Sequence, residues 1–378
     1  MKPIYVPILK AKKGEFDAVT HLSKRAGQQI IPLFDVPQQD KENAKSVESF
    51  LRKVVSGIAN VMKGKSIFMD LSQWAPNAQT EGGEHVIPYL RNQLERCDVI
   101  VNLVVKYDFW HDPAYVDAMK SIRLEKSRNY CIRLNMDNDT VEDVKADPDY
   151  VAEQLTDIIE QLAANPRDIC LLIDFGDISG SKPSIEDMID EAKQIISLAQ
   201  NTGFSQFILA GASFPISIDK AVGERDSEGL VLRKEMITWQ ALLSETPTLN
   251  ITFADYGVRN PNSPDGSQYF SHTNGKIRYT IDEKYFIARG HRLYRTGNKF
   301  RQFCDLAQVI IGSGHYLGEK FSWGDEQILL YSNPDEKKTG NQAIWISIDT
   351  NHHIETVVME ILEFHLQLAA KEARMYQK

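Results

Sequence analysis

Charged side chains stand at the ends of several apolar runs, where they could carry out acid–base chemistry. Asp70 and Asp174 are the clearest cases, because each follows an apolar run directly and precedes another apolar residue. A carboxylate at the edge of a core needs a partner, and Lys10, Lys106 or Arg133 could supply it. These groups are therefore candidates for general acid–base catalysis. An internal layer of ion pairs without a catalytic role is the structural alternative.

The other candidates share a position after an apolar run. We predict as catalytic Lys10, Asp35, Asp70 and Asp174, and as substrate-binding Lys106, Arg133, Ser213, Tyr256, Arg259 and Arg289. Asp35, Asp70 and Asp174 could together hold Mg²⁺, since hard cations prefer oxygen ligands, although nothing in the spacing requires a metal. HExxH and GxSxG motifs are absent, so zinc-protease and serine-hydrolase chemistry have no support.

Residues 276–301 separate the charge of the chain into two parts. This segment holds eight Lys or Arg against Asp282 and Glu283, a net +6, which leaves −15 for the rest of a chain whose net charge is −9. Five aromatic residues interleave with the basic ones, and this composition is typical of segments that bind phosphates and stacked bases. The alternative is a solvated segment whose charges pair with an acidic surface.

Eight short, nearly continuous apolar runs alternate with longer amphipathic runs, and we expect the eight to be strands. They are Ile4–Leu9, Gln29–Phe34, Ser66–Leu71, Asp98–Val105, Tyr130–Leu134, Ile169–Phe175, Gln206–Ala210 and Asn250–Ala254. Such runs are typical of parallel strands buried on both faces. Eight βα units indicate an α/β fold of the (β/α)8 TIM-like barrel type, in which functional groups gather at the C-terminal ends of the strands. A doubly wound open sheet is the alternative, but its Gly-rich turn is absent.

After the eighth strand the pattern changes. Lys276–Arg289 alternates on both sides of Asp282-Glu283 and predicts a β-hairpin inserted in the last loop. Helices are expected at Phe300–Ile311, Trp323–Leu330 and His353–Arg374, with Ala343–Ile348 strand-like. We therefore divide the chain into a barrel body (1–258), an inserted loop and hairpin (259–298) and C-terminal helices that pack on the barrel (299–378).

Composition excludes several classes of protein. With 42 % hydrophobic and 25 % charged residues, the 378-residue chain is ordinary for a globular protein, and its acidic balance argues against a generic nucleic-acid coat. No apolar stretch approaches the ~20 residues of a membrane span, so no membrane partner is expected. The four cysteines form no CxxC pair, and reduced thiols of this kind favour a cytoplasmic location.

Four segments carry a family resemblance. VPILKAKKGEFDAV, IIPLFDVP, FSWGDEQI and AIWISIDTNHHIETVV resemble the phage beta-protein family, which also occurs in bacterial genomes. The positions concerned are Lys10, Lys12, Gly14, Glu15, Pro32, Asp35, Trp323, Gly324, Asp325, Trp345, His352 and His353. The resemblance spans most of the chain and implies a phage or anti-phage context, but no catalytic residues. Within these segments, Asp325 is a candidate N-cap and His353 a candidate for a bond across to the barrel.

Two functions from different classes are consistent with these observations. The first is an enzyme that acts on a phosphorylated or nucleotide-like substrate at the barrel mouth, such as a hydrolase of phosphate esters. The second is a non-catalytic module that recognises nucleic acid or a phage or host protein through the basic-aromatic hairpin. A purely structural partner in a larger complex is a third. The sequence does not identify a cofactor.

Overall fold

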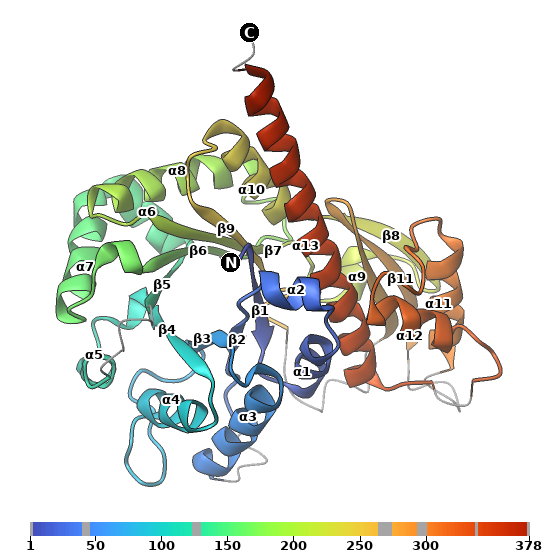
Figure 1. The fold of residues 1–378 in the computed structure, drawn as a ribbon, viewed down its shortest axis with the longest axis horizontal. Helices are drawn as coiled ribbons and strands as arrows, with labels where there is room; N and C mark the ends of the chain where they lie inside the picture. Colours follow the sequence, from blue (N-terminus) through green and yellow to red (C-terminus); the bar gives the residue numbers. More distant parts are fainter. Residues whose placement is uncertain are drawn as a thin grey trace.

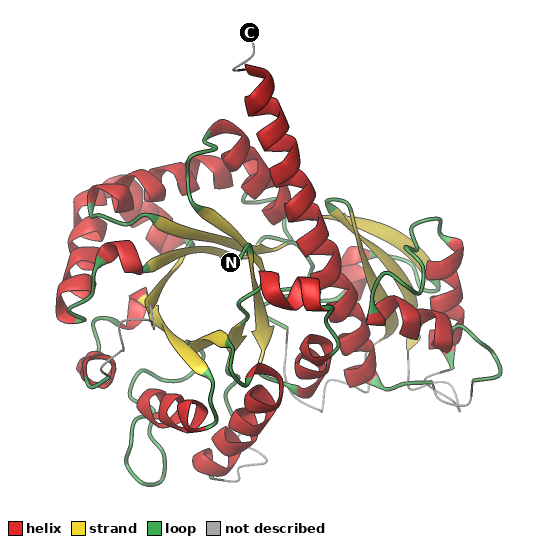
Figure 2. Cartoon of the chain, in the orientation of Figure 1, coloured by secondary structure: helices red, strands yellow, loops and turns green. Residues whose placement is uncertain are grey.

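Eight parallel strands close into a barrel surrounded by helices (Figure 1 and Figure 2). The computed structural model describes residues 3–39, 46–122, 130–263, 274–292, 301–336 and 339–375. The barrel strands, in their order around the barrel, are β1 (Tyr5–Lys10), β2 (Leu33–Asp35), β3 (Ser66–Asp70), β4 (Ile100–Lys106), β5 (Tyr130–Asn135), β6 (Cys170–Asp177), β7 (Gln206–Ala212) and β9 (Ile251–Asp255). The (β/α)8 prediction is confirmed, and each predicted strand overlaps one of these eight.

The register of the strands aligns polar residues at one rim of the barrel. Lys10 is paired with Asp35, and Asp35 with Asp70, so the ends of β1, β2 and β3 lie in one row. Farther around the barrel, Asn135 of β5 is paired with Asp174 of β6. The C-terminal ends of parallel strands meet at one rim, and this rim carries the functional groups in barrels of this type.

The helices cover the outside of the barrel. They are α1 (Lys13–Thr20), α2 (Lys24–Gln29), α3 (Val47–Met62), α4 (Val86–Arg96), α5 (Pro113–Lys120), α6 (Asn138–Ala146), α7 (Pro148–Gln161), α8 (Ile185–Asn201) and α10 (Lys234–Glu245). The short helix α9 (Ile218–Ala221) contacts β8 (Ser227–Leu232) instead. Helix α8 begins with a capping box, because Ser184 accepts from the Asp187 N–H and Asp187 accepts from the Ser184 N–H. Leu51, Val54 and Ile58 form the buried stripe of α3, with the three- and four-residue spacing of one helix face.

A separate antiparallel sheet of three strands lies beside the barrel. Its order is β10 (Asn274–Ile281), β11 (Lys284–Arg292) and β8 (Ser227–Leu232). The predicted hairpin is confirmed as β10 and β11. Strand β8 was not predicted, because its sequence, SEGLVL, contains Glu and Gly and lacks a continuous apolar run. It lies within the segment assigned to the barrel body, so two distant parts of the chain build this small sheet.

Three helices complete the C-terminal part: α11 (Gln302–Gly312), α12 (Trp323–Tyr331) and α13 (Gln342–Met375). The strand-like interpretation of residues 343–348 is wrong, because these residues form the first turns of α13. Trp345 and Ile348 are three positions apart and both buried in the core beneath the small sheet, so packing overrides the β propensity of this run. Helix α13 runs between the barrel and the small sheet and contacts both (Figure 1).

Two neighbouring histidines fasten α13 to different partners. His353 lies 2.9 Å through Nε2 from Asp255 of the barrel and 2.8 Å through Nδ1 from the Thr280 hydroxyl, as the predicted bond across to the barrel requires. His352 instead bonds through Nδ1 to Asp325 at 2.8 Å. Asp325 is not the N-cap of α12, because Ser322 holds that position. These buried hydrogen bonds join the barrel, the small sheet and the C-terminal helices.

Two compositional predictions concern the thiols and the membrane. Cys97, Cys131, Cys170 and Cys304 are all free, and Cys131 is buried. Within the described ranges, no helix has both the length and the apolar character needed to cross a membrane. The cytoplasmic location stays a prediction.

Candidate functional site

A polar cavity of about 320 Å³ opens at the C-terminal rim of the barrel. Its lining comes from the ends of several strands and the loops that follow: Lys10, Asp35, Ser72, Gln73, Arg133, Asn135, Tyr256, Pro261, Asn262 and Ser263. The volume lies within the range of small-molecule sites, and almost all of the lining side chains can hydrogen-bond. We call this space the mouth cavity. Its size and polarity suit a small polar molecule.

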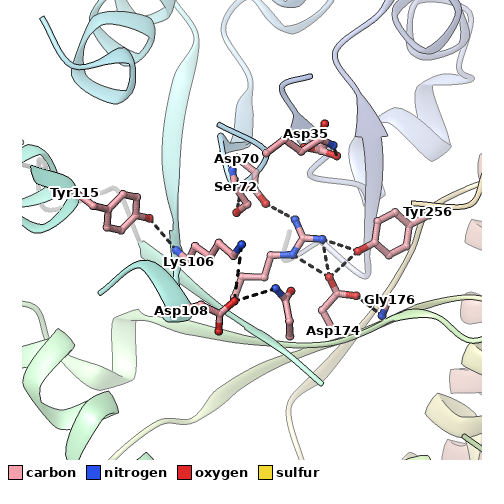
Figure 3. Close-up of polar contacts among 12 residues, drawn as sticks. Asp35, Asp70, Ser72, Lys106, Asp108, Tyr115, Asp174, Gly176 and Tyr256 are labelled. Carbon is pink, nitrogen blue, oxygen red and sulfur yellow. Dashed lines mark hydrogen bonds and ion pairs between the residues drawn. The ribbon is translucent and has the colours of Figure 1, made fainter. Parts of the chain in front are cut away.

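The buried guanidinium of Arg133 lines the mouth cavity. Figure 3 shows the contacts that Asp70, Asp174 and Tyr256 make with it. Arg133 donates from Nε and Nη2 to Asp174 Oδ2, at 2.8 and 2.6 Å, and from Nη1 to Asp70. Its Nη2 also donates to the Tyr256 hydroxyl, which in turn donates to Asp174 at 2.6 Å. Burial alone would lower the pKa of Arg133, but Tyr256 and the surrounding carboxylates raise it well above its usual value. Arg133 therefore stays charged.

Asp70 and Asp174 are occupied by these and other bonds. The second oxygen of Asp70 accepts from the Ser72 N–H at 2.7 Å and from the Ser72 hydroxyl. The second oxygen of Asp174 accepts from the Gly176 N–H at 2.9 Å. This geometry favours the ion-pair alternative for both residues, because each carboxylate holds Arg133 in place. The catalytic role predicted for the two residues stays a prediction.

The magnesium prediction receives no support from this arrangement. In the part of the chain that the structure describes, no three His, Cys, Asp or Glu side chains could together hold a metal ion. The positive charge between Asp70 and Asp174 is the guanidinium of Arg133, which contacts both carboxylates. Asp35 bonds to Gln73 instead, so the three carboxylates do not form one oxygen cage.

Asp35 differs from the other two carboxylates. One of its oxygens accepts from the Gln73 amide, and the other, Oδ1, is buried without a hydrogen-bond partner among the described residues. Burial, followed by the negative charge of Asp70, raises the pKa of Asp35 to about 7, against the opposing effects of Arg133, Lys10 and Gln73. At neutral pH this carboxyl therefore exists in both protonation states. That property suits a general acid or base.

Lys10 lies beside Asp35 at the same rim. It ends β1, faces Asp35 in the strand register and is largely buried. Its ammonium donates to the carbonyl of Ser263 at 3.2 Å, which ties the loop after β9 to the first strand. Lys10 and Asp35 thus bring opposite charges to the wall of the mouth cavity.

Lys106 and Arg259 lie near the rim but are held by carboxylates. The ammonium of Lys106 lies 3.8 Å from Asp108, whose pKa is raised chiefly by burial (Figure 3). Arg259 pairs with Glu15 at 2.9 Å in a narrow hollow beside the mouth cavity. Neither residue lines the mouth cavity itself, so their predicted role in binding substrate stays a prediction.

Ser213 and Arg289 lie elsewhere in the fold. Ser213 donates to Glu235 and accepts from the Lys234 N–H at 2.8 Å, behind β7. Arg289 belongs to the small sheet, where it donates to the backbone carbonyls after α9. Both are buried and neither lines the mouth cavity. Position at a strand end, or a positive charge, was not enough to place them at the mouth.

Several functional groups of the described part of the basic-aromatic hairpin are buried, although Lys284 is exposed. Arg278 donates to Asp349 and to the Val258 carbonyl, both at 2.8 Å. Tyr279, Tyr285 and Phe286 are buried. Of the segment used to predict an exposed binding surface, Tyr294, Arg295, Lys299 and Phe300 lie outside the described residues.

Sequence reasoning did not select several residues of the cavity wall. The strand-end pattern does include Gln73 after β3 and Asn135 at the end of β5, but neither was among the residues predicted to react or to bind substrate. Ser72, two positions after β3, was not considered. Asn262 and Ser263 lie eight and nine positions after the end of the predicted eighth strand, Asn250–Ala254, and neither side chain is charged, so nothing in the sequence marks them. Only the path of the loop after β9 brings them to Lys10.

The model of the Beta protein family matches residues 5–359. The chain belongs to the Beta protein family. The match includes every residue that lines the mouth cavity, the whole small sheet and α13 as far as residue 359. No curated protein matches the chain.

Proposed function

We propose that this member of the Beta protein family is a phage-related enzyme that hydrolyses a small phosphorylated or nucleotide-like molecule in the mouth cavity. The observation that carries the proposal is Asp35: a carboxyl with a pKa of about 7 that lines a polar cavity and has one oxygen without a hydrogen-bond partner in the described chain. Proton donors in enzymes are tuned toward neutral pH in this way. Family membership supports the phage-related context.

The charges around the mouth cavity determine how such a substrate would bind. Lys10 and Arg133 provide two positive charges, and Asp70 and Asp174 balance them. An ionised Asp35 would add a negative charge next to a phosphate that itself carries about −1.5 to −2 at pH 7. Phosphate binding is therefore favoured when Asp35 is protonated. Substrate binding is thus coupled to protonation of Asp35, and the bound complex holds the proton that catalysis needs.

Each residue then has a defined role. Lys10 binds the phosphoryl oxygens, and Arg133 adds a fixed positive charge below them. Protonated Asp35 donates its proton to the oxygen that leaves as water attacks phosphorus and the P–O bond breaks. Asp70, Asp174 and Tyr256 keep Arg133 in one orientation, because they bind all three of its nitrogens.

Two substrates with different leaving groups test this role of Asp35. Nucleoside monophosphates release an alkoxide that needs a proton, whereas p-nitrophenyl phosphate releases a stable phenolate. Asp35→Asn should lower kcat for the nucleotide by roughly 10²–10⁴-fold, the usual contribution of a general acid, and should change the rate for p-nitrophenyl phosphate much less. Phosphate release measures the first reaction and absorbance the second.

Glu235→Gln is the matched control. Glu235 is also a buried carboxyl whose pKa burial raises to about 7, but it bonds to Ser213 and does not line the mouth cavity. This variant should keep both activities. Equal loss of both reactions in Asp35→Asn would contradict a leaving-group role, and a wild-type protein inactive on both phosphate esters would contradict the proposed reaction.

A further inference from the structure

Strand β8 forms an open edge of the small sheet. In the described chain it pairs only with β11. The N–H of Arg233, directly after β8, donates to the carbonyl of Glu283 at the β10–β11 turn, at 2.7 Å. Backbone groups of successive residues in an antiparallel strand point to opposite sides. Those of the odd-numbered residues therefore face β11, and those of Glu228, Leu230 and Leu232 face outward.

Strand β8 also carries two exposed leucine side chains beside this edge. Leu230 and Leu232 are 54 % and 42 % exposed, which is high for leucine. Leu230 stands directly opposite Phe286 of β11, which is buried in the core formed with α11 and α12. The apolar face of the sheet thus continues onto β8 and ends in solvent. An edge with unpaired backbone groups and exposed leucines is a template for another strand.

We propose that β8 pairs antiparallel with β8 of a second copy of this chain, which gives a two-fold symmetric dimer. With the axis at Leu230, this residue faces the second copy's Leu230, and Glu228 faces the second copy's Leu232. These are the three residues whose backbone groups point outward, so the register pairs all of them. The two small sheets then form one continuous sheet across the dimer.

The segment is complementary to itself in its side chains as well as in its backbone. The central row across the joined sheet reads Phe286, Leu230 and then the second copy's Leu230 and Phe286, all apolar. Glu228 meets a leucine, so no like charges stand opposite each other, an arrangement that would be unfavourable. An apolar central row without opposed like charges therefore makes a second copy of this segment a compatible occupant, and it is the occupant that we propose.

Light scattering coupled to size-exclusion chromatography tests the dimer. Wild-type protein should elute as a dimer. Leu230→Lys places two ammonium groups opposite each other at the axis and should weaken dimerisation by roughly tenfold or more. Leu366→Lys, at an exposed leucine on α13, adds the same charge elsewhere and should leave the dimer intact. A monomeric wild-type protein, or a Leu230→Lys variant that dimerises like wild type, overturns the proposal.

Cross-linking tests the register independently of stability. In the proposed pairing the two Leu230 Cα atoms lie about 5.5 Å apart, so Leu230→Cys should be captured as a dimer by a short bis-maleimide. The two Glu228 positions lie about 13 Å apart along the strands, so Glu228→Cys should react no more than the wild-type protein with its four cysteines. Equal cross-linking of both variants overturns the register.

Discussion

Replacing Asp35 with Asn should change how the stability of the protein depends on pH. The pKa of this carboxyl rises from 3.8 to about 7 in the folded protein, first through burial and then through the charge of Asp70. The folded state therefore keeps the proton at pH values where the unfolded chain has released it. The contribution of Asp35 to wild-type stability falls as pH rises from about 4 to about 7, and Asp35→Asn removes this contribution.

The magnitude follows from the shift. About three pKa units at about 1.4 kcal/mol each give roughly 4 kcal/mol. The free energy of unfolding of Asp35→Asn minus that of wild type should thus be about 4 kcal/mol larger at pH 8 than at pH 4, so the variant gains stability relative to wild type as pH rises. Urea titrations followed by tryptophan fluorescence across this pH range measure the difference.

The comparison variant makes the result specific. Glu235→Gln should show a change of the same sign, because burial also raises the pKa of Glu235 to about 7. It should nevertheless keep its activity on nucleoside monophosphates, whereas Asp35→Asn should lose most of that activity. A stability difference between Asp35→Asn and wild type that stays constant from pH 4 to pH 8 would refute the shifted pKa. It would also remove the physical basis for Asp35 as the acid.

Three further predictions concern stability and binding. Asp174→Asn should lower the free energy of unfolding by about 3–5 kcal/mol, because it removes half of the buried pairing of Arg133; urea titration at pH 7 checks this, and Asp174→Asn as stable as wild type would contradict the pairing. Asp187→Asn should destabilise the protein at neutral pH and do so less at pH 2, because Lys182 and the Ser184 N–H lower the pKa of that carboxyl and its stabilising contribution declines as acid protonates it. Melting temperatures at pH 2 and pH 7 check this, and the pH trend relative to wild type should be opposite to that of Asp35→Asn. Binding of inorganic phosphate, measured by calorimetry, should weaken as pH rises through about 7 in wild type and lose that component of its pH dependence in Asp35→Asn.

The sequence was sufficient for the barrel and for the rim at which polar groups meet. Eight short apolar runs separated by helical patterns predict parallel strands, and parallel strands bring their C-terminal ends to one rim. For this reason Lys10, Asp35, Arg133 and Tyr256, which are far apart in the chain, were all expected at the mouth. They do line one cavity.

Only the tertiary structure decided which charges pair. Arg133 bonds to Asp70 and Asp174, which lie 63 and 41 residues away, and this choice leaves one Asp35 oxygen without a partner among the residues that the structure describes. The signs of the charges alone permit other pairings. Distance and burial select among these pairings, and the sequence does not specify either. The same reason explains why β8 was missed. Its sequence pattern is weak, and it forms a strand because β11 provides backbone hydrogen-bond partners.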